Sequence, residues 1–107
     1  MRKIETQMIA AINNNQNWQN ANTSVHYNEE SGASIVRLHG HKIAVVDDNS
    51  VIISNAGYET NVTKSRLNVI INEFCDGKTD GVFQKDFKWY IKDNNNVIPF
   101  ISGYVFN

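Results

Sequence analysis

TKSRLNVIINEF, residues 63–74, is the segment that decides the fold. Its large apolar residues recur every three or four positions, which places them on one side of a helix. This stripe consists of Leu67, Ile70, Ile71 and Phe74. Thr63 is the predicted N-cap, because its hydroxyl can accept a hydrogen bond from a free N–H group of the first turn. The segment therefore predicts a central amphipathic helix, over about residues 63–75, that packs on a sheet.

Apolar residues at near-helical spacing predict a second helix near the N-terminus, over about residues 3–13. Residues 16–22 are expected to be a polar connector that Trp18 pins to the core. Short β-branched runs, separated by Gly, Asn and Asp, predict strands in the rest of the chain. These runs cover residues 23–27, 34–39, 42–46, 51–54, 82–85, 87–92, 97–100 and 104–106. Strands this close in sequence pair mostly antiparallel, so the expected fold class is α+β with a mainly antiparallel sheet.

Length and composition favour one globular domain over residues 1–107, with 41% hydrophobic and 20% charged residues. The net charge of −1 and the pI of about 6.3 give no bulk attraction to nucleic acid or to an anionic membrane. Cys75 is the only cysteine, and the first residues do not form the apolar core of a signal peptide. We therefore expect a protein of a reducing cytoplasm with no membrane association.

Two cationic features are the candidate binding sites. The first is the start of the central helix, where Thr63, Lys64, Ser65 and Arg66 could hold a phosphate or carboxylate beside free backbone N–H groups. Ordinary capping with solvated charge is the competing interpretation.

The second feature is in the segment 87–92. Phe87, Trp89 and Ile91 alternate with a cationic and aromatic set, so the strand is expected to have one apolar and one exposed face. The exposed set, with a neighbouring lysine added, is Lys85, Lys88, Tyr90 and Lys92. Aromatic residues among cations suit single-stranded nucleic acid. Lysines that protect an ordinary strand edge are the alternative.

Catalytic and metal-binding signatures are weak. His39 and His41 flank Gly40, with His26 on a neighbouring strand, but no carboxylate or cysteine stands at ligand spacing. Cys75 lies at the end of a helix, where the dipole raises a thiol pKa and reduces reactivity. The paired acids fall in turn sequences, and no glycine-rich phosphate loop is present. We expect no enzyme activity, no metal and no cofactor.

Several motifs resemble small accessory proteins encoded by tailed bacteriophages. They are LHGHKIA at residues 38–44, TKSRLN at 63–68 and GVFQK at 81–85, and the likeness spans roughly residues 1–100. The resemblance implies no catalytic residues. It implies a protein of the host bacterial cytoplasm that binds host machinery, as small phage accessory proteins often do, and inhibits it.

These observations favour a non-catalytic phage protein that docks onto a host bacterial protein complex and modulates or inhibits it. Anti-defence activity would be one form of this function. The alternatives are a small nucleic-acid-binding protein, which would use the same two cationic features, and a minor virion or assembly component. Self-association through an exposed sheet edge is left open.

Overall fold

The computed structural model describes all residues from 1 to 107 and contains two helices and nine strands. The helices are α1 (Lys3–Asn13) and α2 (Asn61–Phe74). The strands are β1 (Trp18–Asn20), β2 (Thr23–Asn28), β3 (Ala33–Leu38), β4 (His41–Val46), β5 (Val51–Ile53), β6 (Gly81–Lys85), β7 (Lys88–Asp93), β8 (Asn96–Pro99) and β9 (Tyr104–Phe106). The predicted α+β class, with antiparallel pairing throughout, is confirmed.

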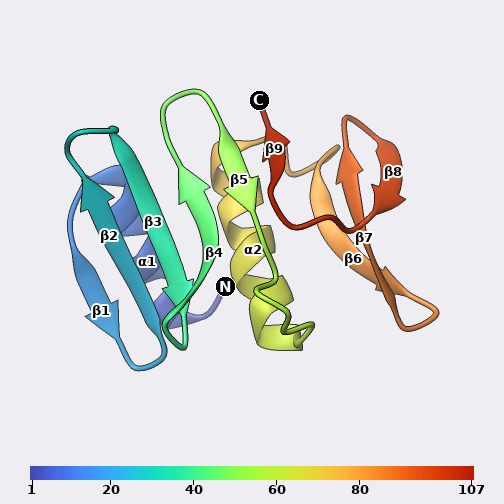
Figure 1. The fold of residues 1–107 in the computed structure, drawn as a ribbon, viewed down its shortest axis with the longest axis horizontal. Helices are drawn as coiled ribbons and strands as arrows, with labels where there is room; N and C mark the ends of the chain where they lie inside the picture. Colours follow the sequence, from blue (N-terminus) through green and yellow to red (C-terminus); the bar gives the residue numbers. More distant parts are fainter.

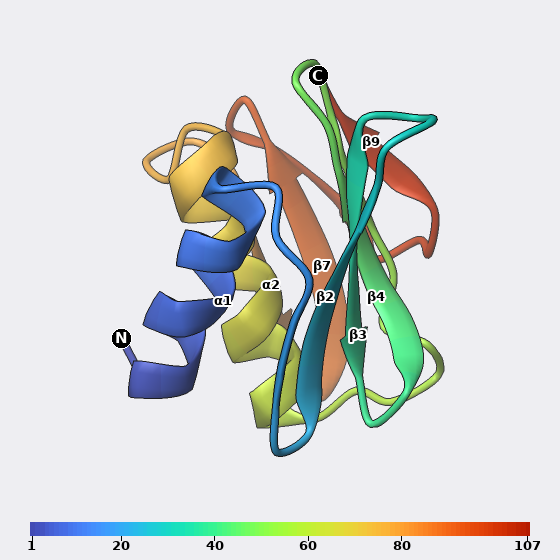
Figure 2. The same ribbon diagram turned by 90° about the vertical axis from the view of Figure 1, so that its left-hand side faces the viewer.

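Most strands form one six-stranded antiparallel sheet in the order β1-β2-β3-β4-β5-β9 (Figure 1). The first five strands follow one another along the chain because short turns connect them, and β9 returns from the C-terminus to pair with β5. Both helices lie against one face of this sheet, while no element covers its other face (Figure 2). Neither helix has the length and apolar character needed to cross a membrane.

The remaining strands form a separate three-stranded sheet in the order β6-β7-β8, which the sequence alone did not distinguish from the first. Asn68 of α2 binds the edge strand β6, because its side chain donates to the carbonyl of Val82 and accepts from the N–H of Val82, both at 2.8 Å. The Tyr104 hydroxyl donates to the Asp93 carboxylate at 2.6 Å and connects the two sheets. The small sheet is therefore held at the side of the molecule by α2 and β9.

The helical stripe faces the core, as predicted. Leu67, Ile70 and Ile71 are fully buried, and Phe74 is half-buried against the same core. The core is a single cluster of 19 buried residues from both helices and both sheets. Burial of each large aliphatic side chain contributes about 1.5–3 kcal/mol, so this stripe attaches α2 to the sheets.

Three local predictions are wrong. The central helix begins at Asn61 and its N-cap is Thr60, whose hydroxyl accepts from the Thr63 N–H at 3.1 Å, so Thr63 is not the cap. The expected connector contains β1, because Trp18, Gln19 and Asn20 pair with β2. Phe87 is not part of a strand face but lies in the turn between β6 and β7.

Candidate interaction surfaces

Arg66 lies inside the molecule and does not contribute to a cationic surface. Its side chain is 4% exposed, and its Nη1 atom donates to the Glu5 carboxylate at 2.9 Å. Its Nε atom donates to the Thr23 hydroxyl at 3.1 Å. The network joins α1, α2 and β2, since Glu5, Arg66 and Thr23 come from these three elements. The expectation of an exposed Arg66 is wrong because the helix face that carries Leu67 and Ile70 also turns Arg66 inward.

The Glu5 carboxylate remains charged in this buried position. Burial by itself raises the pKa of a carboxyl group. Hydrogen bonds from the Ser65 hydroxyl at 2.6 Å, from the Arg2 backbone N–H at 3.1 Å and from Arg66 outweigh this effect, together with the positive charge of Arg66. The pKa of Glu5 therefore lies below its usual value, and the pair is ionised at neutral pH.

The predicted site at the start of α2 is mostly internal structure. Thr63 is buried and its hydroxyl lies 3.0 Å from that of Thr60. Ser65 donates to Glu5, and Arg66 is ion-paired. Lys64 is partly exposed and is the only one of the four predicted residues whose side chain makes no hydrogen bond or ion pair. The sequence could not reveal this, because Glu5 is about sixty positions away in the chain.

The second predicted feature is a contiguous surface. The strand register places Phe83 opposite Tyr90, and their rings stack with centroids 5.5 Å apart. Lys85 faces Lys88 across the same pair of strands. Residues of the small sheet alternate between a buried side, with Val82, Trp89 and Ile91, and the opposite side, which we call the outer face. The outer face consists of Phe83, Lys85, Lys88, Tyr90, Lys92, Val97 and Pro99.

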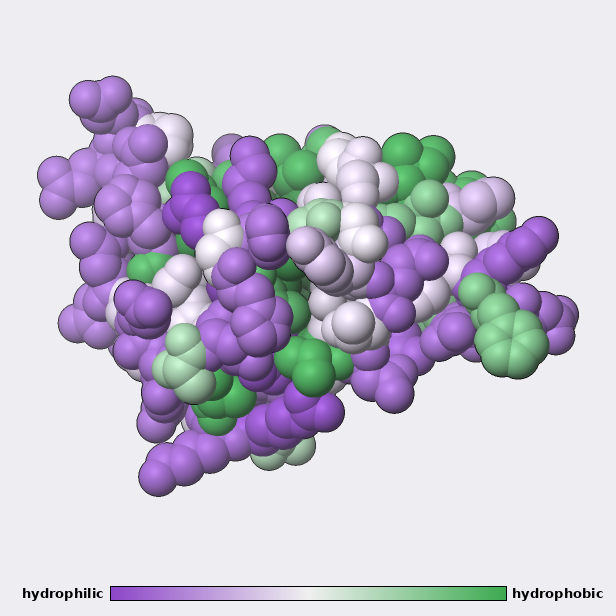
Figure 3. Space-filling model, turned by 60° about the horizontal axis from the view of Figure 1, so that its bottom comes forward, coloured by the Kyte–Doolittle hydropathy of each residue, from purple (hydrophilic) through white to green (hydrophobic).

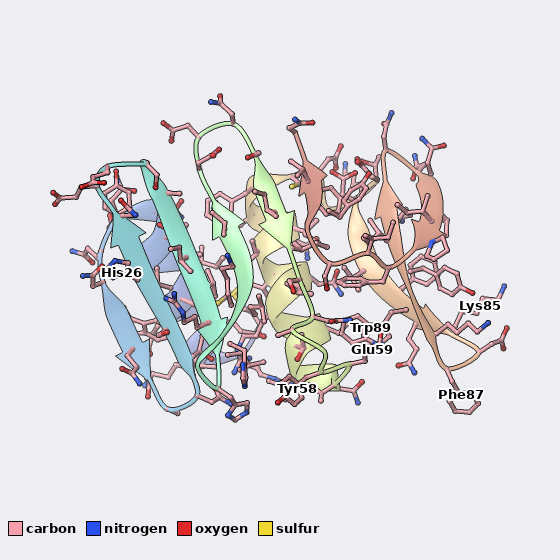
Figure 4. The ribbon with its side chains drawn as sticks, viewed as in Figure 1. His26, Tyr58, Glu59, Lys85, Phe87 and Trp89 are labelled. Carbon is pink, nitrogen blue, oxygen red and sulfur yellow. The ribbon has the colours of Figure 1, made fainter.

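The sequence reasoning separated the strands 82–85 and 87–92 by a break at residue 86, but it missed that Phe87 belongs to the tip of the β6–β7 hairpin. Asp86 and Phe87 form a two-residue turn, both with positive φ (52° and 65°), as a type I′ turn requires. Phe87 is 94% exposed and projects away from the molecule at the tip of the hairpin (Figure 4). The left-handed conformation is a genuine outlier for a bulky residue. The sequence offers no clear signal for Phe87, because Asp-Phe is not one of the glycine-containing pairs that mark a two-residue hairpin turn.

The remaining candidate residues of the sequence analysis are the histidines, the acids and Cys75. No group of three His, Cys, Asp or Glu side chains has an arrangement that could hold a metal ion. Burial, with the charges of Asp80 and Asp93, raises the pKa of the Cys75 thiol to about 11. At neutral pH this half-buried thiol is protonated and a poor nucleophile.

Comparison with known proteins places the chain in a family. The family model described as Kyanoviridae Gp96 protein matches residues 1–107, the whole chain. The chain belongs to the Kyanoviridae Gp96 protein family. This is a phage family, so membership confirms the resemblance to small phage accessory proteins. No curated protein and no solved structure matches the chain. Kyanoviridae Gp96 membership thus identifies a phage protein, and any functional proposal depends on the surfaces described above.

Proposed function

We propose that this phage protein is a non-catalytic binding protein that docks onto a host bacterial protein complex and modulates or inhibits it, with defence complexes among the targets. The hairpin tip at Phe87 is the observation that carries the proposal. An exposed aromatic side chain is a typical anchor for a protein interface, where Trp, Tyr and Arg dominate binding energy and Phe is enriched in the contact.

The hairpin tip has two locally destabilising features. A left-handed backbone costs a non-glycine residue roughly 1–2 kcal/mol, and glycine would avoid this cost at position 87. Lys85 and Lys88 stand directly opposite each other, and like charges in that arrangement are destabilising. Sites where a chain departs from its locally stable choice are expected to be functional. These departures support a binding role for the tip.

Affinity capture tests the proposal. Tagged wild-type protein is expected to retain a host complex from a lysate of the bacterial host, whereas Phe87→Ala and Phe87→Gly lose it. Val105→Ala is the matched control, because Val105 is an exposed apolar residue, 40% accessible, on β9 of the other sheet. Capture that is equal for all variants, or absent at every salt concentration, contradicts the proposal.

Direct nucleic-acid binding is the second candidate, and the outer face is the observation that favours it. Phe83 and Tyr90 offer aromatic surface among Lys85, Lys88 and Lys92, as in proteins that stack bases beside a cationic track. This candidate predicts affinity for single-stranded DNA or RNA that falls steeply with salt, and Lys88→Ala should reduce the slope. The absence of a mobility shift at low salt refutes it.

A further inference from the structure

Charged residues separate to opposite ends of the molecule, although the net charge is only −1. The β2–β3, β4–β5 and β7–β8 turns and the end of α2 lie at one end, at the top of Figure 1. This end carries eight acids and two lysines, Lys78 and Lys92, so it is acidic; the acids are Glu29, Glu30, Asp47, Asp48, Glu73, Asp76, Asp80 and Asp93. The opposite, basic end carries Arg2, Lys3, Arg37, Lys42, Lys64, Lys85 and Lys88. The acids near the basic end are Glu59, Asp86 and the buried Glu5, which is paired with Arg66. The seven cations outnumber them, so the potential of this end is positive.

The basic end contains an apolar hollow of about 400 Å³ between the β3–β4 turn and the loop that leads into α2. Buried Leu38 and Ile43 form its floor, and exposed His41 and Tyr58 form its rim. Seen from this end, hydrophobic surface lies near the middle of the face among hydrophilic groups (Figure 3). No lysine or arginine lines the hollow. Lys42 and Lys64 directly follow two of its lining residues in the chain, and one acid, Glu59, stands between two others.

The rim of the hollow is fixed by local bonds. The rings of His41 and Tyr58 are in contact, with centroids 5.1 Å apart. The Tyr58 N–H donates to the Asn55 carbonyl at 2.8 Å, and the Asn55 side chain accepts from the Gly57 N–H at 2.8 Å. Tyr58 nevertheless remains 54% exposed at the lower edge of the molecule (Figure 4). A fixed aromatic rim around an apolar floor is pre-organised and loses little entropy on binding.

We propose that this hollow binds an apolar side chain carried on an acidic segment of the partner protein. The inference rests on the proposed function and adds the chemistry of the partner. The hollow selects an apolar group because the Thr60 and Thr63 hydroxyls beside it are already bonded to each other. The surrounding cations select acidic neighbours, since complementary charge steers association and opposes wrong partners.

The same charges argue against the other occupants. A second copy of this chain could offer Phe87 as the apolar group, but Phe87 lies between Lys85 and Lys88, which would approach the basic end of the first copy. Nucleic acid would gain little from the hollow itself, whose lining has no cation to contact a phosphate. An acidic protein segment satisfies both the apolar and the electrostatic features.

Amide chemical-shift mapping with synthetic peptides tests the proposal. The probe is a short peptide of glutamate and aspartate that contains one leucine and one tryptophan. When this peptide is added, the amide signals of the protein that shift should be those of His41, Ala56 and Tyr58. The affinity should fall as ionic strength rises. Tyr58→Ala should weaken binding roughly ten-fold, as the loss of an aromatic anchor does. Lys42→Glu leaves the hollow lining unchanged and should also weaken binding, whereas Val105→Ala should not.

Several outcomes overturn the proposal. A peptide with lysine in place of the acids should not bind, and equal affinity for it refutes the electrostatic part. Amide shifts confined to other surfaces of the protein refute the assigned site. Larger shifts of the same amides with a DNA oligonucleotide or with anionic vesicles refute the assigned partner. If the acidic peptide does not bind while capture of the host complex still depends on Phe87, the inference about the hollow is refuted and the proposed function stands. If the peptide binds at the hollow and no host complex is captured, the proposed function fails instead.

Discussion

Replacing Phe87 by glycine should stabilise the protein while removing a binding residue. Phe87 has φ of 65° and is 94% exposed, so the substitution relieves backbone strain and loses almost no buried surface. The left-handed conformation costs an ordinary residue roughly 1–2 kcal/mol. Glycine avoids this cost, but it loses more backbone entropy on folding, and this loss destabilises the folded state by about 0.5–1 kcal/mol. The expected net gain is therefore roughly 0.5–1 kcal/mol, because Asp-Gly is a preferred pair for a type I′ turn.

Urea unfolding followed by tryptophan fluorescence measures this gain. The midpoint for Phe87→Gly should rise while the slope of the free energy against urea stays unchanged, since the exposed surface hardly differs. The melting temperature should rise by roughly 2–8 °C, because about 1 kcal/mol corresponds to about 4–8 °C in a domain near this size.

Phe87→Ala is the matched control for the glycine variant. Alanine removes the aromatic ring but keeps a Cβ atom in the left-handed conformation, so its stability should stay within about 0.5 kcal/mol of wild type. A glycine variant that is no more stable than the alanine variant refutes the argument from strain. A glycine variant that is both more stable and unable to capture the host complex supports a trade of stability for function at this turn.

Three further predictions concern the interior. Arg66→Met leaves the Glu5 carboxylate buried without its ion-pair partner and should lower the free energy of unfolding by about 3–5 kcal/mol, whereas the double variant with Glu5→Gln should recover part of this loss in the same urea assay. Because the pKa of Glu5 is lowered by folding, its contribution is complete above the unfolded pKa of about 4.3 and is lost as the pH falls through the lower folded value. Unfolding free energies measured between pH 7 and pH 3 should therefore fall more steeply for wild type than for Glu5→Gln, and parallel curves would contradict this. With a pKa of about 11, Cys75 should react slowly with a disulfide reagent at pH 8 in the native state and quickly in urea; equal rates would show that the native thiol is not protected.

The predictions that succeeded depend on local periodicity. Spacing of apolar residues predicts α1 with its observed bounds and α2 with its buried stripe, because residues three and four apart share a helix side. Alternation predicts most strands and places Lys88, Tyr90 and Lys92 on one face of β7, because successive side chains point to opposite sides. The chain also contains enough motif similarity to indicate a phage protein, which the family match confirms.

Tertiary structure decided what those elements present to a partner. Arg66 reads locally as a helix-surface cation, and it is buried because Glu5, from the other end of the chain, supplies the compensating charge. The outer face of the small sheet exists because α2 and β9 hold β6–β8 beside the main sheet rather than within it. The basic end likewise combines turns that are distant in the sequence, and a net charge of −1 gives no sign of it. Periodicity determines elements, because it acts between near neighbours, whereas exposure and charge pairing depend on contacts that only the folded chain makes.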